Sequence, residues 1–243
     1  NEYQFILDQL ENTKVIFFAG GEPLTQDKFY EILQYCIDKD LAKDISLWIT
    51  SNCTKLKYKK FNLIEMLKEF KDVELTGSVD AYGERADYMR YPSTWDIVES
   101  NILTMISSVK NLKFIACPTI QIPNVHHIFD LYKYFLMNGI TKSGNIHFNI
   151  LTQPMHFNIK NLPKHHKDDL YKKCDEMSDW LDSNTQYSTH FADKQQFDLL
   201  RSMLDQEPEL LSNDKFISRT NQVDKYRGNN FWDTFPEFSD FLG

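Results

Sequence analysis

Five short apolar segments recur along this chain at intervals of about 28 to 39 residues, and segments with a helical pattern lie between them. Each apolar segment is rich in β-branched and aromatic residues, which predicts a strand. The interval leaves room for one helix after each strand, as in the βα units that build a parallel sheet. The predicted strands cover residues 15–19, 45–50, 73–79, 112–117 and 146–151.

The segments that separate the strands carry apolar residues with the period of an amphipathic helix. After Thr25 these residues recur at positions i, i+3, i+4, i+7 and i+8, and similar stripes follow Thr94 and Asn124. We therefore predict helices at these places, with Thr25 and Asn124 as N-caps. Further along the chain, the patterns predict helices over residues 164–183 and 193–206.

The βα pattern occupies only about 150 residues, whereas a closed eight-unit barrel takes about 250. We therefore predict an α/β fold with a partial barrel in residues 1–160 and a helical C-terminal extension in residues 161–243. The end of that extension, residues 227–243, is dense in phenylalanine. Few basic residues separate these rings, so we expect them to pack across the open edge or bottom of the sheet rather than bind nucleic acid.

The first predicted strand stops at the sequence Gly20-Gly21-Glu22-Pro23. Its five apolar residues predict a strand that is covered on both faces. The two glycines permit backbone angles and a close approach to a ligand that a Cβ would prevent, and Pro23 ends the strand. The motif is typical of a ligand site with one carboxylate, Glu22, at its mouth, and it also fits an ordinary turn from a strand into a helix.

Polar residues follow each of the five predicted strands. Because the carboxyl ends of parallel strands meet at the same edge of a sheet, we expect these residues to line one pocket. Its carboxylates suit a cation, and its hydroxyl and amide groups suit a sugar or an amino-acid backbone. The strand ends are Gly20-Gly21-Glu22, Thr50-Ser51-Asn52, Ser78-Val79-Asp80, Thr119-Ile120-Gln121 and Thr152-Gln153.

With these motifs in this order, the chain resembles the radical S-adenosylmethionine (SAM) enzymes, in particular those with a short C-terminal twitch domain. The resemblance covers nearly the whole chain, and it implies a partial barrel of six βα units, (β/α)6, whose first unit is incomplete in this sequence. The matching segments are Gly20-Gly21-Glu22-Pro23, Thr50-Ser51-Asn52, Ser78-Val79-Asp80 with a loop through Asp87-Tyr88-Met89-Arg90, and Arg227-Gly228-Asn229-Asn230-Phe231.

The resemblance also implies a set of SAM-binding residues. In this set, Glu22 and the glycine backbone hold the ammonium of the methionine part, and Arg90 pairs with its carboxylate. Ser78 and Asp80 face that carboxylate or the ribose. Arg90 also fits a structural ion pair, and Asp80 also fits a loop cap. The full set is Gly20, Gly21, Glu22, Pro23, Ser51, Asn52, Ser78, Asp80, Arg90 and Gln121.

The cysteines of the chain do not follow the pattern that this family uses to bind iron. The family holds a [4Fe-4S] cluster with a Cys-x3-Cys-x2-Cys segment after the first barrel strand, whereas the cysteines here are scattered. Cys36 and Cys174 lie on apolar helix faces and are interpreted as core residues, and Cys53 is interpreted as an auxiliary thiol or a pocket-lining residue.

The chain opens on Asn1, within a predicted helix over residues 1–10. We therefore expect the cluster ligands to lie upstream of Asn1 and this sequence to be a fragment that is inactive alone. The alternative is a natural protein that has lost its chemistry.

The resemblance implies that the intact protein is an enzyme that reductively cleaves SAM at the cluster and so makes a 5′-deoxyadenosyl radical. It implies an electron donor such as a flavodoxin, and we expect a peptide or a small molecule as substrate. Two other functions remain open. One is a non-catalytic module that binds SAM or another nucleotide, and the other is a cluster-free α/β barrel hydrolase or isomerase that uses Glu22 and Asp80 as an acid and base pair.

The charge and hydropathy of the chain argue against other classes. The formal net charge of -8 does not favour nucleic acid as a partner. No apolar run approaches the roughly 20 residues that span a bilayer. Since no charged-then-apolar leader is visible, we expect a cytoplasmic protein.

Two pairs of neighbouring histidines, His126-His127 and His165-His166, lie in predicted helical regions. Neighbours on a helix diverge by about 100°. We therefore expect these histidines to be surface residues that do not share a metal ion.

Overall fold

The computed structural model of the protein describes residues 2–187, 191–210 and 212–242, so Asn1 at the start of the predicted first helix lies outside the described residues. The chain forms two compact units. The first comprises residues 1–78 and 96–116, and the second comprises residues 79–95 and 117–243. The division at residue 160 into a partial barrel and an extension stays a prediction.

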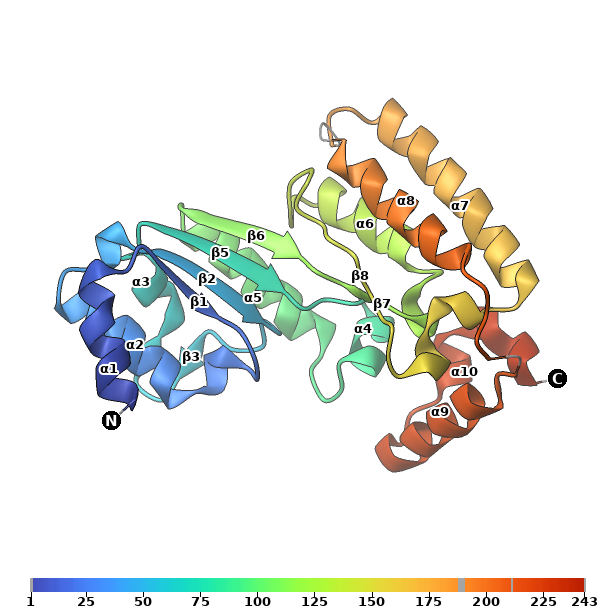
Figure 1. Cartoon of the computed structure of the whole chain (residues 1–243), viewed down its shortest axis with the longest axis horizontal. Coiled ribbons are helices and arrows are strands. Elements are labelled where there is room, and N and C mark those ends of the chain that lie inside the picture. The colour runs from blue at the N-terminus through green and yellow to red at the C-terminus, as the bar shows by residue number, and fades with distance from the viewer. Residues whose placement is uncertain (1, 188–190, 211, 243) are drawn as a thin grey trace. The chain divides into compact units, whose positions relative to one another are not determined.

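Within the described residues of the first unit, a four-stranded sheet has the order β1-β2-β5-β6, and all its strand pairs are parallel. Its strands follow the chain from one edge to the other, which places the connecting helices α2, α3 and α5 on one face (Figure 1). The strands are β1 (Val15–Phe18), β2 (Ser46–Ser51), β5 (Asp72–Gly77) and β6 (Leu112–Ala116), and the helices are α2 (Asp27–Asp38), α3 (Leu63–Leu67) and α5 (Trp95–Ser108).

The two faces of this sheet differ in their exposure. On one face, Leu47 and Ile49 of β2 are buried. On the other face, Phe17 of β1 is 61% exposed and contacts Trp48, which is 42% exposed. The prediction that the first strand is covered on both faces is therefore wrong, because β1 is an edge strand and helices of this unit cover only one side of it.

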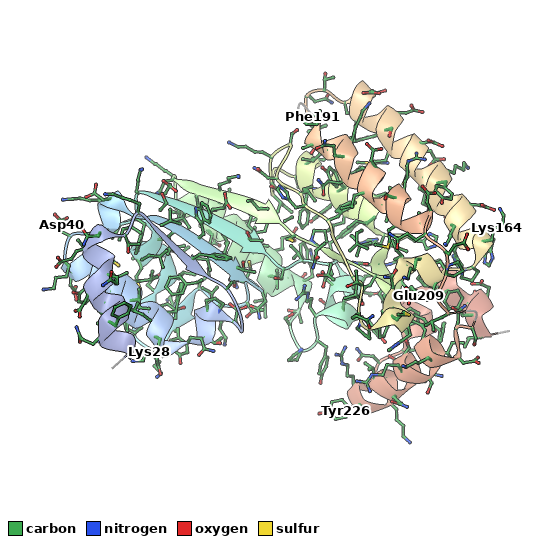
Figure 2. The ribbon with its side chains drawn as sticks, in the orientation of Figure 1. Lys28, Asp40, Lys164, Phe191, Glu209 and Tyr226 are labelled. Atoms are coloured by element: carbon green, nitrogen blue, oxygen red, sulfur yellow. The ribbon has the colours of Figure 1, made fainter. Side chains whose placement is uncertain are left out.

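The remaining elements of the first unit are short. Helix α1 (Glu2–Gln9) precedes β1, and a hairpin of β3 (Lys57–Tyr58) and β4 (Phe61–Asn62) precedes α3. Charged side chains such as Lys28 and Asp40 lie on the outside of this unit and form ion pairs with their neighbours along the chain (Figure 2).

The second unit is mainly helical. Its strands β7 (Thr119–Ile120) and β8 (Asn149–Ile150) pair in parallel with each other. The fifth predicted strand, residues 146–151, is thus shorter than expected, and it pairs with β7, which lies outside the five predicted strands. The helices are α4 (Glu84–Met89), α6 (Ile128–Met137), α7 (Lys164–Ser183), α8 (Ala192–Leu204), α9 (Asp214–Arg227) and α10 (Phe231–Thr234), with a 3-10 helix at Pro236–Leu242.

Both predicted N-caps lie in 3-10 turns rather than at the start of an α-helix. Thr25 ends the turn Pro23–Thr25, and its hydroxyl donates to the Glu22 carbonyl at 3.0 Å. Asn124 ends the turn Ile122–Asn124, and its side chain accepts from the Gln121 N–H at 2.9 Å. The prediction that these residues are the N-caps of the two α-helices is therefore wrong: the N-cap of α2 is Gln26 and that of α6 is His127, because a 3-10 turn precedes each helix.

The phenylalanines near the C-terminus are buried within the second unit. Phe231 contacts Phe216 of α9 and Tyr88 of α4, and Phe238 contacts His126 and His166. These ring contacts join helical segments, so the expectation that the tail packs across the edge or bottom of the sheet does not describe them.

The described residues form an α/β fold with a parallel sheet and helices, as predicted, and within them the sheet does not close into a barrel. Among the helices of the described ranges, none has the length and apolar composition needed to cross a membrane.

Candidate functional site

The carboxylate of Glu22 is held in place at the carboxyl end of the first strand. Its Oε1 atom accepts hydrogen bonds from the Leu24 N–H at 3.1 Å and from the Ser51 hydroxyl at 2.7 Å. Its Oε2 atom accepts from the Asn52 N–H at 2.7 Å. Residues that are 29 and 30 positions apart in the chain therefore meet here, because β1 and β2 are adjacent parallel strands.

Two glycines lie directly before this carboxylate. Gly20 has a φ of 85° and Gly21 a φ of 61°. Residues with a side chain rarely adopt such positive φ angles. A Cβ atom at either position would meet no described heavy atom within 4 Å. The backbone beside Glu22 therefore borders open space, and a bound molecule can approach it closely.

Buried groups of α2 support the turn that carries Glu22. The hydroxyl of Tyr30 donates to the Leu24 carbonyl at 3.1 Å. Burial raises the pKa of Tyr30 to about 12, and the negative charge of Glu22 adds to this effect. Tyr30 thus stays neutral, and its hydroxyl anchors the turn through the Leu24 carbonyl.

The end of β2 is shaped by a network around Ser51. The buried Ser51 hydroxyl accepts from the Cys53 N–H at 2.9 Å while it donates to Glu22. The Asn52 side chain accepts from Thr54, so only its backbone N–H contacts Glu22. Ser78 donates its N–H to the Ser51 carbonyl at 2.8 Å, which brings the end of β5 to the same place.

The predicted residues Asp80, Arg90 and Gln121 belong to the second unit. Asp80 is 5% exposed; its Oδ2 atom lies 2.6 Å from Arg90 Nε, and its Oδ1 atom accepts from the Thr119 N–H at 2.7 Å. The structural alternatives for both residues are therefore realised, since Asp80 caps β7 and pairs with Arg90. A further role of these two groups toward a ligand stays a prediction.

Gln121 lines a cavity of about 190 Å³ in the second unit. Tyr88, Met89 and Arg227 line it as well. The sequence did not predict this cavity, because its walls come from α4, the segment after β7, and α9, which are far apart along the chain.

The segment 87–90 was expected to be a loop, but it forms the end of α4 and its cap. It packs against the other matching motif at the end of α9. Arg227 donates from Nη1 to the Tyr88 carbonyl at 3.0 Å, and the Tyr88 hydroxyl donates to Asp224 at 2.7 Å. Two of the motifs that carry the resemblance thus contact each other within the second unit.

The thiols of the described residues do not fit an iron–sulfur cluster. Such a cluster needs several cysteine thiolates close together. Within the described part of the chain, no three cysteines come within reach of a common metal ion.

The expectation that the paired histidines are surface residues is wrong for three of them. His126, His127 and His166 are 7%, 8% and 5% exposed. His126 and His166 pack against Phe238 of the C-terminal 3-10 helix, and His127 contacts Tyr82. Burial lowers the pKa of His127 to about 4, and the nearby charge of Arg85 contributes. Burial, Lys173 and His166 lower the pKa of His126 to about 4.

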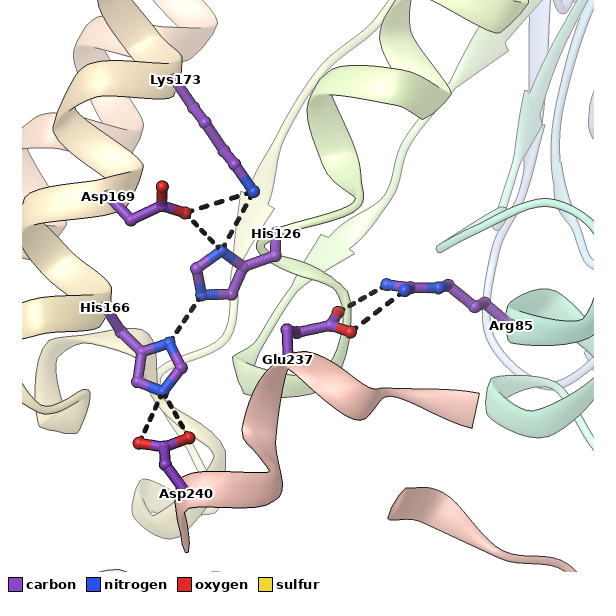
Figure 3. Close-up of polar contacts among 7 residues, drawn as sticks. All are labelled: Arg85, His126, His166, Asp169, Lys173, Glu237 and Asp240. Carbon is purple, nitrogen blue, oxygen red and sulfur yellow. Dashed lines mark hydrogen bonds and ion pairs between the residues drawn. The ribbon is translucent and has the colours of Figure 1, made fainter. Parts of the chain in front are cut away.

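Two of these buried histidines, His126 and His166, belong to a polar network that the sequence did not predict. Figure 3 shows His166 between His126 and Asp240, and Asp169 and Lys173 on the far side of His126. His126 Nε2 lies 3.0 Å from His166 Nδ1. Nearby, Arg85 binds both carboxylate oxygens of Glu237.

The fold and the strand-end groups define an α/β protein with a parallel sheet and a carboxylate held at the carboxyl end of its first strand. A family model described as the radical SAM superfamily matches residues 4–135, which is more than half of the chain. The chain therefore belongs to the radical SAM superfamily.

Solved structures with bound SAM are similar to this chain. Native anSMEcpe with bound AdoMet gives a TM-score of 0.53 at 18% identity, over 76% of this chain and 50% of that chain. SuiB of Streptococcus suis bound to S-adenosylmethionine gives a TM-score of 0.48 at 16% identity, over 75% of this chain and 40% of that chain. The first likeness concerns the fold, and this chain spans half the length of that structure.

The comparison with curated proteins found no match.

Proposed function

We propose that the first unit binds the methionine part of SAM through Glu22 and the backbone of Gly20 and Gly21. One observation carries this proposal. A carboxylate offers about four lone pairs, and among the described residues three donors occupy Glu22, two on Oε1 and one on Oε2. Oε2 therefore retains capacity for one more donor, which the ammonium of methionine would supply.

The residues around Glu22 would act by orientation. Ser51 and the Asn52 N–H fix both oxygens of the carboxylate, so its charge is aimed before the ligand arrives. Such preorganisation lowers the cost of binding, because the ligand does not have to order the group that receives it. Pro23 begins the 3-10 turn and keeps the Leu24 N–H directed at Oε1.

We propose that Ser78 and, in the second unit, Asp80, Arg90 and Gln121 also bind SAM, as the family resemblance implies. The ion pair of Asp80 with Arg90 uses one guanidinium nitrogen, Nε, and a guanidinium offers five N–H donors. The remaining donors of Arg90 suit a carboxylate. Gln121 would offer an amide on the wall of the cavity that Arg227 also lines.

The reductive cleavage of SAM that the family resemblance implies needs a [4Fe-4S] cluster, and the described cysteines do not form a site for one. We propose that the cluster ligands come from outside this sequence, in a longer protein with an electron donor such as a flavodoxin. The match over half the length of the anSMEcpe chain supports this.

We further propose that residues 161–243 serve as a twitch-type extension and that the substrate is a peptide or a small molecule.

The experiment uses the longest natural form of the protein, reconstituted with iron and sulfide and reduced with dithionite. The proposal predicts release of 5′-deoxyadenosine from SAM, and at least about a tenfold loss in kcat/KM, equivalent to about 1.4 kcal/mol, in the variant Glu22→Gln. Cleavage that is absent in a protein shown to contain a cluster would overturn it.

The same experiment separates the two other functions. A non-catalytic module would bind SAM without cleavage and without taking up iron. A cluster-free hydrolase or isomerase would be active without a reductant and would need Asp80 as an acid or base, a role that its bonds to Arg90 and Thr119 do not favour.

A further inference from the structure

We propose that His165, His166 and Asp240 form a binding site for one Zn²⁺ ion in the second unit, separate from the SAM-binding residues. The site would join the first turn of α7 to the 3-10 helix at Pro236–Leu242.

The three side chains converge on one point. His165 Nε2 lies 2.7 Å from Asp240 Oδ2, and His166 Nε2 lies 3.1 Å from Oδ1 and 3.2 Å from Oδ2. The ligand atoms of all three residues lie within 4.8 Å of one another. Although neighbouring helix positions diverge, these two occupy the first turn of α7, and Asp240 reaches both rings.

This donor set has the chemistry of a zinc site. Zinc with two imidazoles and one carboxylate keeps a fourth position for water, and its ligand bonds are about 2.0 to 2.2 Å. Tetrahedral ligands at such bond lengths lie roughly 3.3 Å apart. The contacts of His166 with Asp240 are close to this spacing, and the exposed His165 ring would move to bring its Nε2 atom to the same spacing.

The ring of His166 is held as metal-binding histidines usually are, with its second nitrogen in a hydrogen bond. His166 Nδ1 lies 3.0 Å from His126 Nε2 (Figure 3). His126 Nδ1 in turn lies 3.2 Å from Asp169 Oδ2 and 3.4 Å from Lys173 Nζ. Asp169 is thus an acceptor and Lys173 a donor beside the Nδ1 atom of His126. Either tautomer of His126 therefore finds a partner when an ion binds to His166.

The site is rigid on one side and open on the other. The ring centroids of Phe238 and Phe241 lie 5.2 and 5.3 Å from that of His166, and these contacts fix the orientation of the His166 ring. The side chains of His165 and Asp240 are 65% and 42% exposed. An ion can therefore enter from solvent, and a water molecule can take the fourth position.

The test uses the chain from which bound metal has been stripped with a chelator, and the chelator is removed before the titrations. Titration with Co²⁺, followed by the visible absorption of four-coordinate cobalt, reports the geometry, and titration calorimetry with Zn²⁺ reports affinity and stoichiometry. We expect one ion per chain with a dissociation constant in the micromolar range. We also expect the free energy of unfolding to rise with added Zn²⁺.

Two of the informative variants change the exposed ligands His165 and Asp240, and a third changes the buried His126, which contacts His166. His165→Gln and Asp240→Asn should each weaken binding at least about tenfold and abolish the cobalt absorption, and His126→Phe should weaken it about tenfold through the orientation of His166. His147→Gln, at an exposed histidine away from the cluster, should bind like the wild type. The proposal would be overturned if the wild type bound Co²⁺ without the absorption of four-coordinate cobalt. It would also be overturned if His165→Gln and Asp240→Asn both bound Zn²⁺ with the wild-type affinity.

Discussion

At the scale of single residues, three hydrogen bonds determine the direction of the Glu22 carboxylate. The residue type and its place after a strand were visible in the sequence, and so was the prospect that Ser51 and Asn52 would lie nearby. The sequence could not show that Asn52 contributes its backbone N–H while its side chain turns toward Thr54. That choice depends on the local backbone after β2.

The hydroxyl of Ser51 provides a direct test of this orientation. Ser51→Ala removes one donor to Glu22 and one acceptor for the Cys53 N–H. We expect the free energy of unfolding to fall by about 1 to 2 kcal/mol and SAM affinity to fall about threefold to tenfold. Denaturant unfolding and calorimetric titration measure the two effects. The control Ser107→Ala, at an exposed helix position, should change neither, and unchanged SAM affinity in Ser51→Ala would contradict the assigned role.

The buried His127 predicts how stability depends on pH. Its ordinary pKa of 6.5 is lowered to about 4 in the folded chain by burial and by Arg85, with Asp130 opposing. The ring of Tyr82 contacts the His127 ring at a tilt of 35°, with the ring centroids 4.5 Å apart. Below about pH 6.5 the unfolded chain binds a proton that the folded chain refuses until about pH 4, so stability falls as the pH falls through this window.

We expect His127→Phe to remove about 1 to 2 kcal/mol of the stability that the wild type loses between pH 7 and pH 5. Urea unfolding at the two pH values measures this difference. His147→Asn, at an exposed histidine, should leave the loss as in the wild type. An equal loss in the wild type and in His127→Phe would show that the ring is already protonated in the folded state.

At the scale of elements, the sequence predicted most where the pattern is local. The four long strands lie where they were expected to within two residues at each end, and α7 has the predicted bounds. The sequence predicted less where the outcome depends on distant partners. The covered or exposed state of β1 depends on its place at the sheet edge, and the enclosure of His166 depends on a tail segment 74 residues further along the chain.

The attachment of α8 depends on one buried carboxylate. Asp193 accepts from the Tyr132 hydroxyl of α6 at 2.5 Å, from the Ser143 hydroxyl at 2.6 Å and from the Gly144 N–H at 2.9 Å. Asp193→Asn replaces an acceptor oxygen with a donor and removes the charge, and we expect it to cost about 2 to 3 kcal/mol. Asp198→Asn, on the exposed side of the same helix, should cost less than about 0.5 kcal/mol. Similar losses in the two variants would contradict the role of Asp193.

At the scale of the whole molecule, the two compact units carry different parts of the proposed chemistry. The first unit holds the Glu22 carboxylate and the adjoining strand ends, and most of the family match falls on its residues. The second unit holds the cavity beside Gln121 and the histidine cluster. The βα rhythm predicted the first unit well, because a parallel sheet follows from local periodicity. The same βα pattern predicted little of the cavity beside Gln121 or of the histidine cluster. Their residues come from helices whose packing no local pattern specifies.

Calorimetric titration of SAM into the wild-type chain and into Glu22→Gln tests the central claim most directly, with Glu65→Gln at an exposed ion pair as the matched control. The account predicts micromolar binding to the wild type and to the control, and at least about tenfold weaker binding to Glu22→Gln, since the amide removes the negative charge that receives the ammonium. Equal affinity of the wild type and Glu22→Gln, or no binding to the wild type, would contradict it.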